Sequence, residues 1–467
     1  MKQFVLSKRP QGLGWSATLA VAALAWGQAV ALTVIPESPG SLTCRVEPMR
    51  SVIAADTSET MMVKVSLTGR PVMSSRGHRS PINLCLVLDR SGSMQGDRIA
   101  RAKEAAIAAV ERLTAEDIVS VVIFDQQIET VVPAQFARDK DSIVRAIRSV
   151  QARGTTAIFG AMAQAAAEIR KNTHREYLNR IILLSDGQAN VGPAQPSDFG
   201  RLGVSLMKEG ISVSTVGVGL DFNEDLMTSL SGKSDGNSYF VENSDDLPRI
   251  FASELGTALA VVARSVSLRI VFAPGTTPLE IVGREGSING ETVTLDFNQL
   301  YGGQEKYVLI RTAFSPGKDE TSRPVATATV NYVDVAATRS ERVILTATGV
   351  VSFSRDLERV RRSVNTDILR DSELTIDAIA TERALRLIDE GKSREAARIF
   401  EEQRERLERI GRDNPAIAPA AMSRASRQIS NADRASSGTF DARDRKAEVQ
   451  MNYEKFNQQK SSSKSGF

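Results

Sequence analysis

Three oxygen-bearing side chains, Asp89, Ser91 and Ser93, follow an apolar run at alternate positions. The run Leu84–Leu88 is typical of a buried strand, which delivers its last residue to one edge of a sheet. Gly92 lets the backbone turn tightly between the two serines. Carboxylate and hydroxyl oxygens that converge on one point suit a hard divalent cation such as Mg²⁺. A coincidental loop with capping serines explains the same spacing, so this motif alone leaves both interpretations open.

Two later segments carry the same chemistry. Thr155 and Thr156 precede a helical stretch and offer hydroxyl groups. Asp186 follows a second apolar strand, Ile181–Ser185, as Asp89 follows the first. Each motif therefore places a hard oxygen ligand at the end of a strand or at the start of a helix.

Taken together and in this order, the three motifs resemble the metal-ion-dependent adhesion site of the von Willebrand factor A domain. The resemblance covers roughly residues 81–259. Thr156 is favoured over Thr155, because Ile158 then falls where the family has its apolar helix residue. The resemblance implies Mg²⁺, with Mn²⁺ or Ca²⁺ as alternatives, bound by the side chains of Asp89, Ser91, Ser93, Thr156 and Asp186.

Three neighbouring residues are candidates for a supporting role around the ligands: Arg90, Thr155 and Asp125. Arg90 either attracts an acidic partner or makes a surface salt bridge. Asp125 follows a strand, where it either caps a hairpin turn or lies near the site. The sequence leaves these alternatives open.

Strands and helices alternate between residues 81 and 259, which predicts a doubly wound α/β fold with a mostly parallel sheet. Ile118–Phe124 is typical of a buried strand, and Ile128–Val132 of an antiparallel edge strand. Ligands of such sheets bind outside the carboxyl ends of the strands. Asp89 and Asp186 follow two of these ends, so the fold and the chemistry agree.

The pattern after residue 260 changes to β. Alternating segments between Val266 and Ala347, punctuated by glycines, predict a β-sandwich over residues 260–353. The alternating segment Val63–Leu67 precedes the α/β region and needs partners, since one or two strands form no stable sheet. We therefore predict that it pairs with Val266–Ala347, which makes the α/β region an insertion in the β domain. The two ends of the insertion are then expected at the sheet edge opposite the metal ligands.

Beyond residue 354 the apolar residues recur at helical spacing among many charges. Gly391 and Ser393 separate two such stretches, which predicts a helical hairpin over residues 354–414. The Ser-, Arg-, Lys- and Gln-rich stretch over residues 415–467 is predicted to be disordered.

Residues 1–31 have the pattern of a secretory signal peptide: a basic start, the apolar run Trp15–Ala31, and small residues at its end. The alternative is an uncleaved anchor, although the run is short for a membrane span of about 20 residues. Residues 32–80 are expected to form a strand segment and a linker. We expect an exported protein of the periplasm or cell surface, with at most a single N-terminal membrane anchor.

The composition excludes several other classes. A net charge of +3 over 467 residues, without a concentrated basic region, does not indicate a nucleic-acid partner. The two histidines, His78 and His174, provide little material for zinc chemistry. The two cysteines, Cys44 and Cys85, make no disulfide scaffold, and the sequence leaves open whether they pair.

These patterns favour a binding protein over an enzyme. A cation held by two serines, a threonine and acidic residues keeps an open coordination position, which a carboxylate of a protein partner can fill. The alternatives are an assembly factor or chaperone, a subunit that resembles channel regulators, and, with less support, a Mg²⁺-dependent hydrolase. No general base at recognisable spacing accompanies the motifs.

Overall fold

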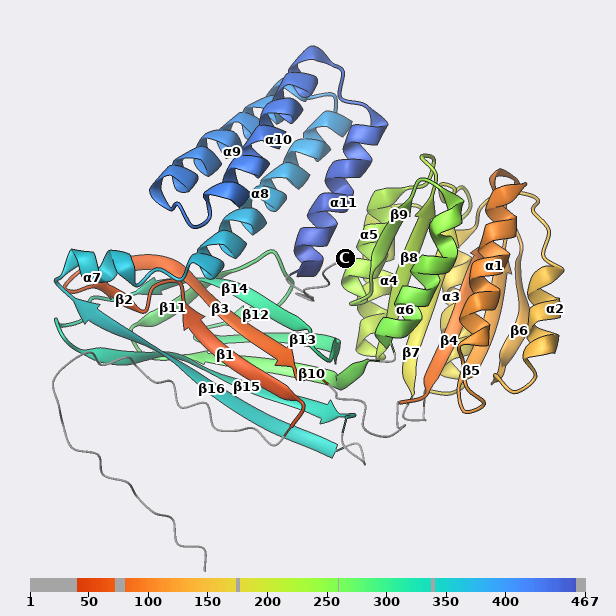
Figure 1. Ribbon diagram of the computed structural model, residues 1–467, viewed down its shortest axis with the longest axis horizontal. Helices are drawn as coiled ribbons and strands as arrows, with labels where there is room; N and C mark the ends of the chain where they lie inside the picture. The colour runs from red at the N-terminus through yellow and green to blue at the C-terminus, as the bar shows by residue number, and fades with distance from the viewer. Residues whose placement is uncertain (1–39, 72–79, 174–176, 259, 337–340, 459–467) are drawn as a thin grey trace, which may run out of the picture. The chain divides into compact units, whose positions relative to one another are not determined.

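The computed structural model describes residues 40–71, 80–173, 177–258, 260–336 and 341–458 (Figure 1). These residues form three β-sheets and eleven α-helices. The expected signal segment, residues 1–31, lies outside the described residues. None of the helices in the described part combines the length and the apolar character that a membrane crossing requires.

A six-stranded sheet forms the α/β region. Its strands are, in order across the sheet, β6 (Ile128–Phe136), β5 (Ile118–Phe124), β4 (Ile82–Asp89), β7 (Leu178–Ser185), β8 (Ile211–Val218) and β9 (Ser238–Val241). Neighbouring strands are parallel, except that β6 runs antiparallel to β5, as predicted. Every residue of β4 is buried, because helices cover both faces of the sheet.

Six helices cover this sheet, three on each face (Figure 1). They are α1 (Asp97–Glu111), α2 (Lys140–Arg148), α3 (Ile158–Arg170), α4 (Pro196–Lys208), α5 (Glu224–Lys233) and α6 (Leu247–Ala258). Helices α1, α2 and α6 share a core with Leu84 and Leu86, and α3, α4 and α5 share one with Cys85 and Val87. Side chains alternate between the two faces along a strand, so β4 contributes to both cores. The doubly wound α/β fold predicted from the sequence is confirmed.

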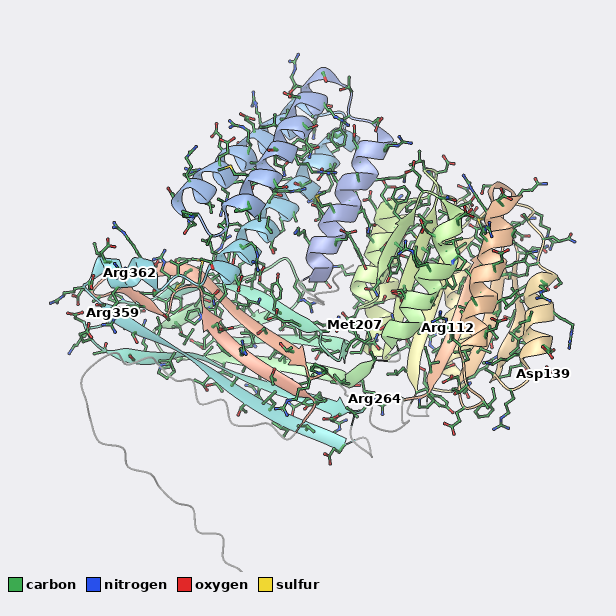
Figure 2. All side chains as sticks on the ribbon, viewed as in Figure 1. Arg112, Asp139, Met207, Arg264, Arg359 and Arg362 are labelled. Carbon is green, nitrogen blue, oxygen red and sulfur yellow. The ribbon has the colours of Figure 1, made fainter. Side chains whose placement is uncertain are left out.

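Side chains cap two of these helices. Asp139 accepts a hydrogen bond from the Ser142 N–H at the start of α2 (Figure 2). Asn223 accepts one from the Leu226 N–H at the start of α5. Such a cap satisfies a backbone donor that the first helical turn leaves free.

The strand order reverses at the centre of the sheet. The chain passes from β4 to β5 on one side and returns to β7 on the other. The loops that leave β4 and β7 therefore diverge to opposite sides, which opens a crevice at the carboxyl ends of these strands. Asp89 ends β4, and Asp186 follows β7 directly.

Two further sheets combine strands from both sides of the α/β region. One has the order β1 (Leu42–Pro48), β3 (Glu59–Gly69), β14 (Glu305–Phe314) and β11 (Thr276–Val282). The other has the order β12 (Ser287–Asn289), β13 (Thr292–Tyr301), β10 (Val261–Phe272), β15 (Ser322–Asp334), β16 (Glu341–Ser354) and β2 (Val52–Ala54). Side chains from both sheets, such as Val65 and Leu268, share one apolar core.

The predicted pairing of Val63–Leu67 is confirmed. This segment lies in β3 and runs antiparallel to β14, with Val63 opposite Ile310 and Val65 opposite Val308. The α/β region is therefore inserted between strands of one sheet. The alternation of apolar and polar residues in β3 was sufficient to predict this pairing, because a strand with an apolar face needs neighbouring strands that share its core.

The two ends of the insertion lie at the amino-terminal edge of the parallel sheet. Ile82, the first residue of β4, is paired with Leu178 of β7. Two residues further along β7, Arg180 donates a 2.6 Å hydrogen bond to the Tyr301 hydroxyl. Tyr301 is the partner of Val261, the first residue of β10. Both ends are thus opposite the carboxyl edge that carries the predicted ligands, as expected.

The carboxyl-terminal region is helical. Its helices are α7 (Leu357–Arg362), α8 (Thr366–Asp389), α9 (Ser393–Asp413), α10 (Ala418–Ser437) and α11 (Ala442–Gln458). The predicted hairpin corresponds to α8 and α9. The turn between them contains Gly391, which has a left-handed backbone conformation (φ +75°). The predicted disorder of residues 415–467 is wrong over α10 and α11, and residues 459–467 lie outside the described part.

The composition of α10 conceals its buried face. Ala421, Ala425 and Ala435 are buried, and so are the polar side chains of Arg424 and Gln428. Alanine has the highest helix propensity, and buried polar groups are tolerated when they are paired. Arg424 is paired with Asp377 of α8, which the sequence could not indicate.

Cys44 and Cys85 are both free and buried, in β1 and β4 respectively. Burial raises the pKa of each thiol to about 12, so neither is a reactive thiolate at neutral pH.

Candidate metal site

The carboxyl group of Asp89 lies at the centre of the candidate site and is completely buried. The Ser91 N–H donates a 2.7 Å hydrogen bond to its Oδ1, and the Ser185 hydroxyl donates to its Oδ2. Burial raises the pKa of Asp89 to about 6, against these hydrogen bonds, and the nearby charge of Asp186 adds to the rise. A buried carboxyl of this kind is stabilised by a positive charge.

The two serine hydroxyls lie between the two carboxylates. The Ser91 and Ser93 Oγ atoms are 3.1 Å apart, and Ser93 donates a 2.7 Å hydrogen bond to Asp186 Oδ1. Asp186 is completely buried, whereas Ser93 reaches the surface. The short 3₁₀ turn Gly92–Met94 brings Ser93 back toward the strand ends.

Thr156 joins the same group of oxygens. A Cβ atom built on Gly187 would lie 3.1 Å from Thr156 Oγ1 and 3.8 Å from Ser93 Oγ, so both hydroxyls border the same point. Thr156 is buried, and its carbonyl accepts hydrogen bonds from the N–H groups of Asn190 and Val191. The structure therefore brings together all five side chains that the sequence singled out as ligands.

These donors fit a hard divalent cation. All five offer oxygen, the ligand atom that Mg²⁺ prefers at about 2.0–2.1 Å. Two oxygen ligands at right angles around such an ion are about 2.9 Å apart. The observed distances are similar: 2.7 Å between Asp186 Oδ1 and Ser93 Oγ, and 3.1 Å between the Ser93 and Ser91 Oγ atoms. In the described residues no group of three or more His, Cys, Asp or Glu side chains is placed to hold a metal ion.

The three candidates for a supporting role differ in their contacts. Asp125 is buried and accepts hydrogen bonds from the Gln127 N–H at 2.6 Å and from Arg153 Nε at 2.9 Å, while Arg90 Nε lies 3.1 Å from it. It therefore closes the hairpin turn and also anchors Arg90. Although burial acts to raise it, these donors and cations hold the pKa of Asp125 below its ordinary value.

Arg90 and Thr155 have structural partners. Arg90 is buried and forms a second ion pair with Glu129, with Nη1 and Oε2 3.2 Å apart. Thr155 is exposed, and its N–H donates to the Gln126 side chain at 2.9 Å. Backbone hydrogen bonds join the two neighbouring loops: the Arg153 N–H donates to the Arg90 carbonyl oxygen at 2.6 Å, and the Gly92 N–H donates to the Gly154 carbonyl oxygen at 3.0 Å.

Two contacts to the ligands come from residues that the sequence reasoning missed. Ser185 holds Asp89, and Arg98 Nη1 lies 2.6 Å from Asp186 Oδ2. Ser185 ends the second apolar strand, so its closeness to Asp186 was a usable signal. Arg98 lies on the first turn of α1 and has no such signal, since only the folded loop brings it to Asp186.

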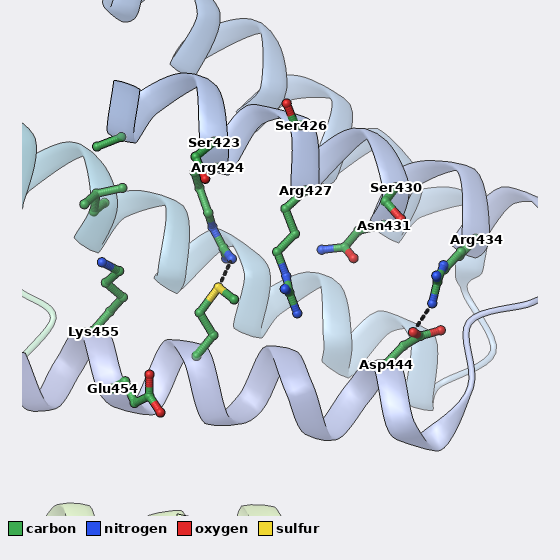
Figure 3. A pocket seen from close by; sticks show the side chains of 13 residues that line it. Ser423, Arg424, Ser426, Arg427, Ser430, Asn431, Arg434, Asp444, Glu454 and Lys455 are labelled. Carbon is green, nitrogen blue, oxygen red and sulfur yellow. Dashed lines mark hydrogen bonds and ion pairs between the residues drawn. The ribbon is translucent and has the colours of Figure 1, made fainter. Parts of the chain in front are cut away.

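The helical region contains a separate cavity of about 790 Å³ between α10 and α11 (Figure 3). Its arginines are largely paired within the protein. Arg424 contacts Asp377 and Glu448, and Arg434 contacts Asp444. None of the five predicted ligands borders this cavity.

Comparison with known proteins identifies the α/β region. Residues 83–253 match the family model of the von Willebrand factor type A domain. Residues 83–253 therefore form a von Willebrand factor A domain, as the three motifs indicated. Such domains commonly mediate protein–protein interactions.

The similar proteins come from bacteria and animals. The chain is 30% identical over 217 residues to sll0103 of Synechocystis, which covers 46% of this chain and 51% of that protein. It is 24% identical over 318 residues to human inter-alpha-trypsin inhibitor heavy chain H2, which covers 65% of this chain and 31% of that protein. The matches span about half, or less, of these relatives' lengths.

The likeness in fold extends beyond the matched domain. The solved structure of a von Willebrand factor type A protein from Catenulispora acidiphila superposes with a TM-score of 0.62 and 17% identity. It covers 80% of this chain and 89% of the other. The two proteins therefore also share part of the fold outside the von Willebrand factor A domain.

Proposed function

We propose that this chain is a protein-binding module that depends on a divalent metal ion, Mg²⁺ in the first place. Asp89, Ser91, Ser93, Thr156 and Asp186 would hold the ion. Its open coordination position would take a carboxylate from a protein partner. Mn²⁺ and Ca²⁺ are the alternatives, since both also bind hard oxygen ligands.

One observation carries the proposal: the side chains of five residues with hard oxygen atoms, two of them buried carboxylates, converge at the carboxyl ends of β4 and β7, where the strand order reverses. Ser93 is exposed, which supports access for a partner from solvent. The bound ion would give the site a net positive charge, which attracts a carboxylate more strongly than a neutral side chain. An acidic group is therefore the preferred partner. The match to a family of interaction domains agrees with binding rather than catalysis.

We further propose that the protein acts in the cell envelope, exported by the segment 1–31. The basic start and the apolar run of this segment support export. An intact-mass measurement of the protein recovered from the separated envelope and cytosolic fractions of its native cells tests this proposal. The expected mature protein begins near Leu32, and a cytosolic protein that retains Met1 would overturn it.

Calorimetric titration with Mg²⁺ tests the metal site. We expect the wild-type protein to bind one ion and the Asp89→Ala variant to bind none, because the substitution removes a charged ligand. Mg²⁺ at about 100 times its Kd stabilises a folded protein by about 2.7 kcal/mol. Its melting temperature should therefore rise with Mg²⁺ in the wild type only.

Asp413→Ala is the matched control. Asp413 is exposed near the end of α9, far along the chain from every predicted ligand. This variant should bind Mg²⁺ as the wild type does. Equal binding by wild type and Asp89→Ala would contradict the assignment. Affinity capture from an envelope extract, with Mg²⁺ and then with a chelator, would afterwards identify the partner.

A further inference from the structure

A guanidinium group lies against one of the two buried carboxylates of the site. Arg98 Nη1 is 2.6 Å from Asp186 Oδ2 and 3.4 Å from the Ser93 carbonyl oxygen. The side chain of Arg98 is 34% exposed, whereas that of Asp186 is not exposed at all. Arg98 therefore reaches the buried carboxylate from the solvent side.

The fold leaves space for this guanidinium. Gly219 follows β8 in a left-handed conformation (φ +76°). A Cβ atom on Gly219 would lie 2.9 Å from Arg98 Nη2, so any side chain there would displace the arginine. The position of Arg98 thus depends on α1, on the metal-site loop and on the exit of β8 together.

Electrostatics gives this contact a role. Asp89 and Asp186 are both fully buried and both acidic. Two ionised carboxylates in one buried site are unfavourable unless a positive charge accompanies them. Within the described residues, Arg98 is the cation that makes an ion pair with Asp186. In the absence of a metal ion it supplies the charge that the ion would otherwise bring.

We propose that Arg98 is an internal counter-cation of the metal site. It pairs with Asp186 and keeps the ligands assembled when no ion is bound, and it competes with the ion for the same carboxylate. It thereby sets the ion concentration at which the site fills. This inference rests on the proposed function, because it assumes that the site binds a divalent ion.

Arg98→Met tests the proposal, since methionine replaces the arginine by an unbranched side chain that has no charge. In the presence of a chelator, the variant should melt at a lower temperature than the wild type. In calorimetric titration it should bind Mg²⁺ about tenfold more tightly, because the competing cation is gone. Arg98→Lys, which retains a charge, should stay nearer the wild type in both measurements.

Arg101→Met is the matched control. Arg101 lies one turn further along α1 and forms ion pairs with Glu104 and Asp245, away from the site. Its loss should leave the Mg²⁺ affinity unchanged. Mg²⁺ affinity in Arg98→Met that is equal to or weaker than that of the wild type would overturn the counter-cation proposal. If the wild type itself binds no divalent ion, the proposed function fails, and the competition with it.

Discussion

At the scale of single residues, the orientation of Asp89 depends on Ser185. The Ser185 hydroxyl donates to one carboxyl oxygen of Asp89, and the Ser91 N–H donates to the other. A carboxylate fixed at both oxygens can present only limited directions to an ion. Partners that orient a metal ligand in this way commonly contribute tenfold to a hundredfold to metal affinity.

We predict that Ser185→Ala weakens Mg²⁺ binding by about tenfold without abolishing it, because Asp89 remains but loses the donor to its Oδ2. Calorimetric titration measures the change. Ser205→Ala is the control, since Ser205 is exposed on α4. Unchanged affinity in Ser185→Ala would show that Ser185 does not orient the ligand.

The sequence indicated the candidate ligands but not the residues that contact them, for a physical reason. Asp89, Ser91 and Ser93 lie within five residues, so their types and spacing are visible in the chain itself. The contact between Arg98 and Asp186 joins residues 88 positions apart. Such a contact exists only after β4 and β7 have paired, and one sequence gives no sign of it.

At the scale of elements, the strands were easier to predict than α4. Alternation marks β3, β10 and β15, because each has one face in the apolar core. Helix α4 carries a weaker signal in the sequence, because its buried face contains Gly200 and Gly203 beside Phe199 and Leu206. Glycine disfavours a helix, so the sequence of α4 resembles that of a loop. Its glycines serve close packing against α5.

Gly203→Ala should therefore destabilise the protein, although alanine is the better helix former. The new Cβ atom would lie 2.7 Å from the Leu230 carbonyl oxygen and 2.9 Å from Lys233 Cβ. We expect a loss of about 1–3 kcal/mol in the free energy of unfolding, the usual cost of overpacking. Urea denaturation measures it.

Gly256→Ala provides the opposite case. Gly256 lies inside α6, and a Cβ atom there meets nothing within 4 Å. This variant should be stabilised by up to about 1 kcal/mol, the difference in helix propensity between the two residues. A Gly203→Ala protein as stable as Gly256→Ala would show that α4 and α5 are not tightly packed at this position.

At the scale of the whole molecule, polar contacts fasten the von Willebrand factor A domain to the rest of the chain. Arg180, which is almost completely buried, joins Tyr301 of the β domain to Glu254 of α6. Lys446 of α11 is also buried, donates to the Phe222 carbonyl and lies 4.2 Å from the centre of the Phe222 ring. Both contacts use buried charges that are paired, as burial requires.

We predict that Lys446→Glu releases α11 from the domain. The substitution places a negative charge beside Glu224, which Lys446 now pairs with, and breaking a buried pair costs about 3–5 kcal/mol. Hydrogen exchange of residues 442–458 should become faster. Arg443→Glu is the control, because the Arg443–Glu242 pair is exposed. Equal protection of α11 in wild type and Lys446→Glu would contradict this docking.

The central claim, a divalent ion held at the carboxyl edge of the sheet, is tested most directly by crystals grown with Mn²⁺. The anomalous scattering of manganese locates the ion without reference to any assumed ligand. We predict one strong anomalous peak bordered by Asp89, Ser91, Ser93, Thr156 and Asp186, and none in crystals of Asp89→Ala. An ordered site without a peak, or a peak bound elsewhere in the wild-type protein, would contradict the account.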